Sequence, residues 1–268
     1  MKTKILSLTL VAGALMVLPT VSRAAIIGSA QDFGTNTWSG KNVCQACHIP
    51  HDSLGGSVAP LWNHVLPDSA KYTTYQSPTF NGGVAAPKPD GPSLACLGCH
   101  DGTLAINQFV VTPYGGTGVG SITNSGAVTL SSPNDDVTGG TGNNLSHNHP
   151  ISFVYDDTLA TADGTLVKPS VYTIGQIPPY PATSTFTNNA ALMVPPVPAS
   201  WTGISLTGKT IKDAMLWQGS AGPEMECTSC HDPHKMMGSS ASSGIMIKIS
   251  GNDVNGRGSL ICRNCHLK

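Results

Sequence analysis

Short runs in which apolar and polar residues alternate, separated by turns rich in glycine and asparagine, make up the middle of the chain. Alternation over a few residues is typical of a half-buried strand, and glycine and asparagine favour the turns between strands. The pattern predicts brief strands at residues 108–112, 121–130, 151–155 and 166–174. A last strand is expected at residues 245–250, followed by a turn over residues 251–258.

One segment, residues 207–217, has the periodicity of an amphipathic helix. Its apolar and charged residues fall on opposite faces: Ile211, Ala214, Met215 and Trp217 on one, and Lys209, Lys212 and Asp213 on the other. Residues 177–199 hold six prolines, which predict an extended, polyproline-like linker. The whole pattern predicts one mostly irregular domain with few short helices and strands.

The N-terminus has the pattern of an export signal. Lys2 and Lys4 precede an apolar run over residues 5–19, and the small residues Ser22 and Ala24 follow it. The run is too short to span a bilayer, and this order of features is typical of a secretory signal peptide. We therefore expect residues 1–24 to be removed and residues 25–268 to be exported. No later segment is apolar enough to suggest a membrane span.

Composition limits both the fold and the partners. Aromatic residues make up 6% of the chain and charged residues 11%, with 30 glycines and 20 prolines. This mixture disfavours long helices and a conventional apolar core, yet disordered chains normally carry more charge. Loss of Lys2, Lys4 and Arg23 with the signal would leave 11 basic and 15 acidic residues, a net charge of −4. Binding to nucleic acid, which needs a basic surface, is not expected.

Every cysteine of the chain belongs to a Cys-X-X-Cys-His motif. The motif occurs four times, at residues 44–48, 96–100, 227–231 and 262–266. This spacing is typical of c-type haem attachment, in which two thiols bond to one haem and the adjacent histidine binds its iron. The thiols would be Cys44, Cys47, Cys96, Cys99, Cys227, Cys230, Cys262 and Cys265, and the proximal ligands His48, His100, His231 and His266.

Zinc and disulfides are the other uses of paired cysteines. Structural zinc sites use Cys-X-X-Cys pairs at a regular separation, whereas these pairs are unevenly spaced and each is followed by histidine. Disulfides suit an exported chain, but cysteines confined to four short loops would cross-link nothing distant. The sequence therefore predicts four covalently bound haem c groups.

Four haems would also resolve the problem of the missing core. Large, mostly apolar cofactors can replace an apolar core, with irregular chain wrapped around them, so we expect the apoprotein to be largely unfolded, as in other proteins whose metal drives folding. The motifs divide the single domain into a haem pair at residues 41–102, a haem-free insert at residues 103–223 and a second haem pair at residues 224–268.

Five histidines remain outside the motifs as candidate distal ligands: His51, His64, His147, His149 and His234. Four of them would give every iron two imidazoles, which leaves no open position for a substrate. Methionine is the other common axial ligand, and Met225, Met236 and Met237 lie near a motif. His51 and His234 each follow a proximal histidine by three residues, and residues three apart project from the same side of a helical turn. Each would therefore bind a neighbouring haem.

The paired motifs of residues 225–234 and 259–266 resemble those of multihaem c-type cytochromes from metal-reducing bacteria. Residues 60–64, followed by Tyr72 and Tyr75, and residues 145–153 resemble segments that supply distal histidines in those proteins. The four motifs and the Cys-His-X-X-His stretches are most similar to OmcE-like extracellular tetrahaem cytochromes, which polymerise into conducting filaments. The resemblance covers residues 41–102, 145–155 and 224–268, without the proline-rich linker.

The resemblance implies specific roles for the spare histidines. The distal ligands would be His51, His64, His149 and His234, with His149 chosen because it precedes proline and His147 left as the alternative. In such filaments a histidine of one subunit binds a haem of the next. By its place in the motif, His51 is the candidate for this cross-subunit bond, and His64 would serve within its own subunit.

The resemblance also implies a function. We expect a non-enzymatic electron-transfer protein, wrapped around a stacked haem chain and located outside the cell or at its surface. Its partners would be further copies of the chain, redox partner cytochromes and extracellular electron acceptors. The alternative is a soluble periplasmic tetrahaem electron shuttle. A multihaem oxidoreductase is a weaker alternative, because it needs an iron with an open site.

Overall fold

The computed structural model describes residues 26–29, 31–55, 58–82, 86–120, 124–130, 137–138, 142–174, 208–234, 248 and 260–267. The expected signal peptide, the proline-rich linker and the turn at residues 251–258 lie outside these ranges. Of the strand expected at residues 245–250, only Lys248 is described.

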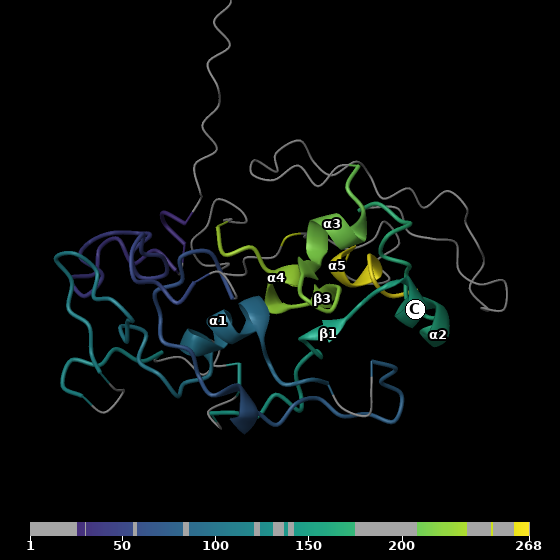
Figure 1. The fold of residues 1–268 in the computed structure, drawn as a ribbon, viewed down its shortest axis with the longest axis horizontal. Coiled ribbons are helices and arrows are strands. Elements are labelled where there is room, and N and C mark those ends of the chain that lie inside the picture. Colours follow the sequence, from purple (N-terminus) through teal and green to yellow (C-terminus); the bar gives the residue numbers. More distant parts are fainter. Residues whose placement is uncertain are drawn as a thin grey trace, which may run out of the picture.

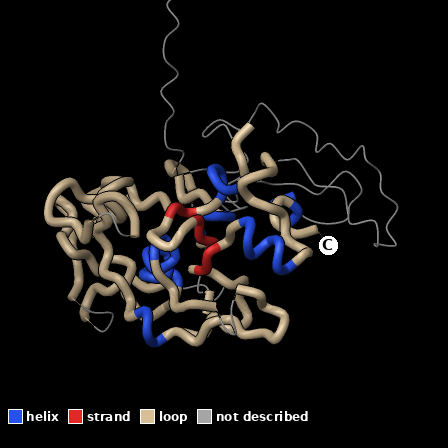
Figure 2. Tube along the Cα trace, turned by 45° about the vertical axis from the view of Figure 1, so that its right-hand side comes forward, coloured by secondary structure: helices blue, strands red, loops and turns tan. Residues whose placement is uncertain are grey.

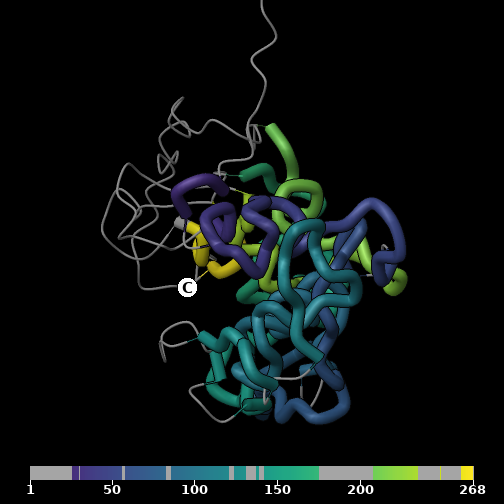
Figure 3. The backbone as a smooth tube through the Cα atoms, turned by 90° about the vertical axis from the view of Figure 1, so that its left-hand side faces the viewer, coloured from purple at the N-terminus to yellow at the C-terminus, as the bar shows by residue number. Residues whose placement is uncertain are grey.

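Irregular chain makes up most of the described residues (Figure 2), which confirms the prediction of a mostly irregular fold. The same winding path is visible from the side (Figure 3). The regular elements are short: η1 (Ser69–Lys71), α1 (Gly91–His100), β1 (Phe153–Val154), α2 (Asp157–Asp163), α3 (Ile211–Met215), β2 (Trp217–Gln218), β3 (Pro223–Met225), α4 (Cys227–Cys230) and α5 (Leu260–Arg263).

A small antiparallel sheet lies next to the helices α1 and α4 (Figure 1). Its strand order is β1–β3–β2, with Phe153 opposite Met225 and Trp217 opposite Glu224. The strand expected at residues 151–155 is thus confirmed over two residues. The described parts of the other four expected strands form no strand of the sheet. Residues 108–112 contribute one bridge, from Phe109 to His64, and residues 166–174 contribute two, from Leu166 to His266 and from Thr173 to Thr210.

The helix expected at residues 207–217 is confirmed only as α3. Thr210 caps α3, since its hydroxyl accepts a hydrogen bond from the Asp213 N–H, a common way to begin a helix. Leu216 is already extended, and Trp217 pairs in the sheet instead of continuing the helix. The expected faces hold within α3, because Ile211 and Met215 are buried and Asp213 is exposed.

Three small apolar clusters hold the irregular chain together. The largest surrounds β1 and α3 and includes Phe153, Tyr155, Ile211, Met215 and Ile261. The second surrounds Trp38, and the third consists mainly of Tyr72, Leu97 and Leu145. Cysteines of the motifs take part in the first two: Cys265 and Cys230 in the largest, and Cys47 and Cys99 beside Trp38. The apolar packing therefore converges on the four motifs.

Candidate haem-binding sites

Each motif forms one helical turn. In three of them the histidine N–H donates to the carbonyl of the first cysteine, at 2.8 Å for His48 and 2.9 Å for His231 and His266. The remaining motif, residues 96–100, is the C-terminal part of α1. A turn brings residues three and four apart to the same side, so each motif can present two thiols and an imidazole together.

The four turns lie against one another. Cys47 of the first motif and Cys99 of the second pack in the same apolar cluster. The Cys96 thiol of the second motif hydrogen-bonds to Cys227 of the third. Cys230 of the third and Cys265 of the fourth belong to the largest cluster. Motifs that are far apart in the sequence thus form one contiguous group.

Burial sets the chemical state of these thiols. Removal from water raises the pKa of Cys47 to about 11 and that of Cys265 to about 12, because a buried thiolate loses its hydration. The hydrogen bond from Cys96 instead lowers the pKa of Cys227 to about 7 and raises that of Cys96. At neutral pH, Cys227 is therefore the most ionised of these four thiols.

Ser93 and Glu226 join the helices of the second and third motifs. The Glu226 carboxylate accepts a hydrogen bond from the Ser93 N–H in α1 at 3.1 Å. In return, the Ser93 hydroxyl accepts from the Cys227 N–H in α4 at 2.9 Å. These bonds satisfy free N–H groups in the first turn of both helices. Sequence reasoning missed both residues, because neither belongs to a motif and they are distant in the chain.

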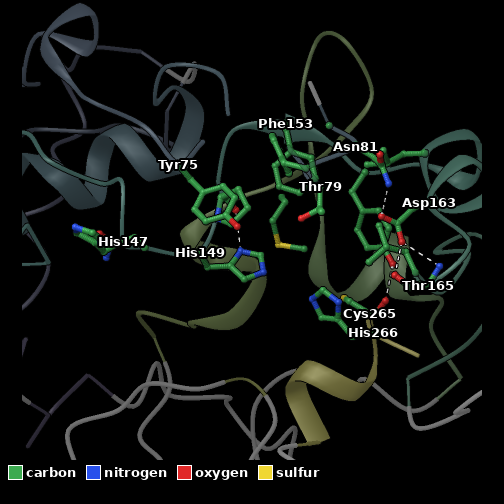
Figure 4. Close-up of a pocket in the computed structure, with 18 residues that line it drawn as sticks. Tyr75, Thr79, Asn81, His147, His149, Phe153, Asp163, Thr165, Cys265 and His266 are labelled. Carbon is green, nitrogen blue, oxygen red and sulfur yellow. Dashed lines mark hydrogen bonds between the residues drawn. The ribbon is translucent and has the colours of Figure 1, made fainter. Parts of the chain in front are cut away.

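A cavity of about 510 Å³ opens beside the fourth motif (Figure 4). Its lining includes Tyr75, Phe80, Phe153, His149 and His266. The volume is in the range of cofactor pockets, and aromatic walls suit a flat, apolar ring system. The Cys265 thiol, the two imidazoles and the apolar wall of this cavity could together hold a flat, apolar cofactor such as a porphyrin.

His149 and His266 face this cavity together, with their ring centres 6.2 Å apart. Two imidazoles that bind one metal at about 2 Å each, with about 1 Å from nitrogen to ring centre, would have centres about 6 Å apart. At this spacing the two imidazoles would be able to bind one metal ion held between them. His147, the alternative to His149, is exposed at the edge of the same cavity.

A second pair of rings has the same spacing. His234, three residues after the third proximal histidine, lies with its ring centre 6.0 Å from that of His48 in the first motif. The two planes differ by 27°. His234 therefore lies beside a different motif from its own.

The remaining histidines differ in their surroundings. His64 is buried against Gly98 of α1, and its Nδ1 and Nε2 lie 2.7 Å from the Val65 carbonyl and 2.9 Å from the Ala105 carbonyl. Burial lowers its pKa, so the neutral ring is favoured. His64 thus lies beside the second motif but would have to exchange the Ala105 contact for a metal bond. His51 is exposed.

The proximal histidines of the second and third motifs also lie close enough to interact. Partial desolvation of the ring, and then the neighbouring charge of His100, lower the pKa of His231, although the residue as a whole is exposed. Neutral imidazole is the form that binds a metal, so this environment favours ligation. On the other side, Nε2 of His100 lies 3.5 Å from the Gln31 amide nitrogen.

No protein-family model matches this chain, and no curated protein is similar to it at a significant level. The described part of the chain contains no helix that is both long and apolar enough to cross a membrane.

Proposed function

We propose that this protein transfers electrons through four covalently attached haems, each held by one Cys-X-X-Cys-His turn. The observation that carries the proposal is the contiguity of the four turns, which meet through Cys47 and Cys99, Cys96 and Cys227, and Cys230 and Cys265. Four redox groups attached to such a cluster would be near neighbours. When bound, haems supply one-electron redox chemistry.

The residues of the chain have three tasks in this proposal. The thiols of each motif would hold one haem covalently, and the proximal histidines His48, His100, His231 and His266 would bind its iron from the same turn. His234 and His149 supply the second imidazole beside His48 and His266, at ring spacings of 6.0 and 6.2 Å. With two protein ligands the iron offers no site for a substrate, which favours electron transfer over catalysis.

The proposal extends to assembly and location. His51 is exposed, as a ligand donated to a neighbouring subunit must be. By its place in the motif we assign it the cross-subunit bond that the resemblance implies, in a homopolymer outside the cell that passes electrons to extracellular acceptors. His64, beside the second motif, serves within its own subunit. Residues 1–24 act as the export signal.

The test is to produce the full chain with a c-type maturation system and measure covalent haem by intact mass and pyridine haemochrome absorbance. Four haems per chain with low-spin spectra are expected. Fewer haems, or a retained zinc ion in their place, would refute the proposal.

Electron microscopy of protein sheared from cells tests assembly: helical filaments support the conduit. Monomers alone, found also in periplasmic extracts, would leave the soluble shuttle.

A further inference from the structure

Three carboxylates outside the haem motifs meet where α1 begins. Asp90 directly precedes α1. Glu224 lies in β3, and Glu226 lies between β3 and α4. One oxygen from each lies within 4.8 Å of the others. This carboxylate cluster thus lies where α1 meets the β3–α4 segment, near the centre of the molecule (Figure 1).

Two of these carboxyl groups are buried, with no cationic side chain paired to them in the part of the chain that the structure describes. Glu226 is 1% exposed and Glu224 is 8% exposed. No lysine or arginine in the described ranges forms an ion pair with either of them or with Asp90, since the ion pair found there joins Lys71 to Asp68. Buried charges in proteins are normally paired or bind a metal, so a cation would suit this cluster.

The two oxygens of Glu226 differ. Oε2 accepts hydrogen bonds from the Ser93 N–H at 3.1 Å and the Ser152 hydroxyl at 3.3 Å. Oε1 is buried and has no hydrogen-bond partner. A buried acceptor without a partner costs about 1–3 kcal/mol, which a cation ligated by Oε1 would offset. The Asp90 side chain makes no capping hydrogen bond to α1, so its carboxylate is also available to bind a cation.

We propose that Asp90, Glu224 and Glu226 bind one Ca²⁺ ion. The donors are all carboxylate oxygens, which suit hard cations. The three donor oxygens lie within 4.8 Å of one another, close enough to share one ion. Mg²⁺ is usually held by one or two carboxylates and keeps most of its waters, whereas Ca²⁺ accepts several carboxylates in a flexible shell, so three carboxylates favour Ca²⁺. Exposed Asp90 leaves room for water as further ligands.

The ion would connect the second motif to the third. Asp90 lies at the start of the helix that carries Cys96, and Glu226 directly precedes Cys227, to which Cys96 hydrogen-bonds. By neutralising the three carboxylates, the bound Ca²⁺ would remove their mutual repulsion at the contact between the second and third motifs. This role is independent of the proposed electron transfer, because none of the three residues is a haem ligand.

Equilibrium dialysis of the purified, haem-loaded chain tests the site. Protein stripped with a chelator is dialysed against buffered Ca²⁺, and bound Ca²⁺ per chain is measured for the parent, Asp90→Asn, Glu226→Gln and Asp68→Asn. The last variant is the matched control, since Asp68 is exposed and is not one of the three clustered carboxylates, although it precedes Ser69, which contacts Pro89 next to Asp90. Asparagine can still cap η1, and glutamine can still accept from Ser93.

We expect one Ca²⁺ bound by the parent and by Asp68→Asn, with the dissociation constant raised at least tenfold by Asp90→Asn and by Glu226→Gln. Bound Ca²⁺ should also raise the unfolding temperature of the parent and the control but not of Glu226→Gln. Equal binding in all four proteins, or none in the parent, would overturn the proposal. Equal or tighter retention of Mg²⁺ would overturn the assignment to Ca²⁺. Unchanged haem spectra verify that each variant is folded.

Discussion

The ring of His234 lies 6.0 Å from the ring of His48, centre to centre, although the two histidines belong to the third and first motifs. The contact gives His234 a partner that its own motif cannot supply. In the proposed haem protein, the position of the first haem would therefore depend on the chain around the third. Similarly, His149 lies beside His266 of the fourth motif, although it belongs to the segment between the two pairs of motifs.

Replacing His234 should change one haem and leave the others intact. His234→Ala removes the second imidazole beside His48, so one iron in four should become high-spin or bind water. Optical and electron paramagnetic resonance spectra measure this fraction. Thr158→Ala is the control, since Thr158 is exposed in α2 and lies outside the motifs and their candidate histidines. Fully low-spin His234→Ala protein would contradict the pairing.

Replacing His149 separates it from its neighbour His147. His149→Ala should also convert one iron in four, because His149 is the ring beside His266. The midpoint potential of that haem should shift, and the potentials of the other three haems should stay the same. Spectroelectrochemical titration measures all four. If instead His147→Ala produces the conversion and His149→Ala does not, the choice between the two histidines is wrong.

Loss of His51 should affect assembly and not haem content. His51→Ala should abolish filaments, because the proposed bond to the next subunit is lost, while intact mass still shows four haems. Negative-stain electron microscopy and size-exclusion chromatography measure the assembly. Normal filaments from His51→Ala would exclude this histidine from the interface.

Gly98 is required by the close approach of the His64 segment to α1. A Cβ at this position would lie 3.0 Å from the Val65 carbonyl oxygen and 3.2 Å from Nδ1 of His64. We expect Gly98→Ala to destabilise the protein by about 1–3 kcal/mol, although alanine favours helix by about 1 kcal/mol. Denaturant unfolding measures the change. Thr158→Ala, at an exposed position of α2, should stay within about 0.5 kcal/mol.

Glu226 should make stability fall as pH rises in calcium-free buffer. Burial, opposed by Ser93 and reinforced by Asp90, raises the pKa of this carboxyl from 4.5 to about 8. A carboxyl with a higher pKa when folded binds more protons in the folded state, so stability is lost from about pH 4.5 to about pH 8 and is constant above. A tenfold difference in proton affinity between the folded and unfolded states corresponds to about 1.4 kcal/mol.

Unfolding in chelator across this pH range compares the parent with Glu226→Gln. The variant has no proton to lose at this position, so its decline in stability should be smaller by several kcal/mol. Parallel curves for the two proteins would show that the Glu226 carboxyl is solvated at this junction.

The sequence by itself determined the local features. The Cys-X-X-Cys-His spacing specifies a turn that needs no distant contact, so its chemistry can be predicted from five consecutive residues. Glycine, proline and low aromatic content predicted the mostly irregular fold, which is confirmed. The helix at residues 207–217 was predicted too long, because pairing of Trp217 with Glu224 outweighs its place in the helical pattern.

Only the tertiary structure decided which motifs meet and what lies between them. The partners of His48, His266 and Cys227 come from distant segments, and no periodicity relates them. The burial of Glu226 also depends on how α1 packs against β3 and α4, since the sequence around it resembles any short polar stretch. In a chain with so little regular structure, side-chain contacts between loops set the geometry, and such contacts leave no local pattern in the sequence.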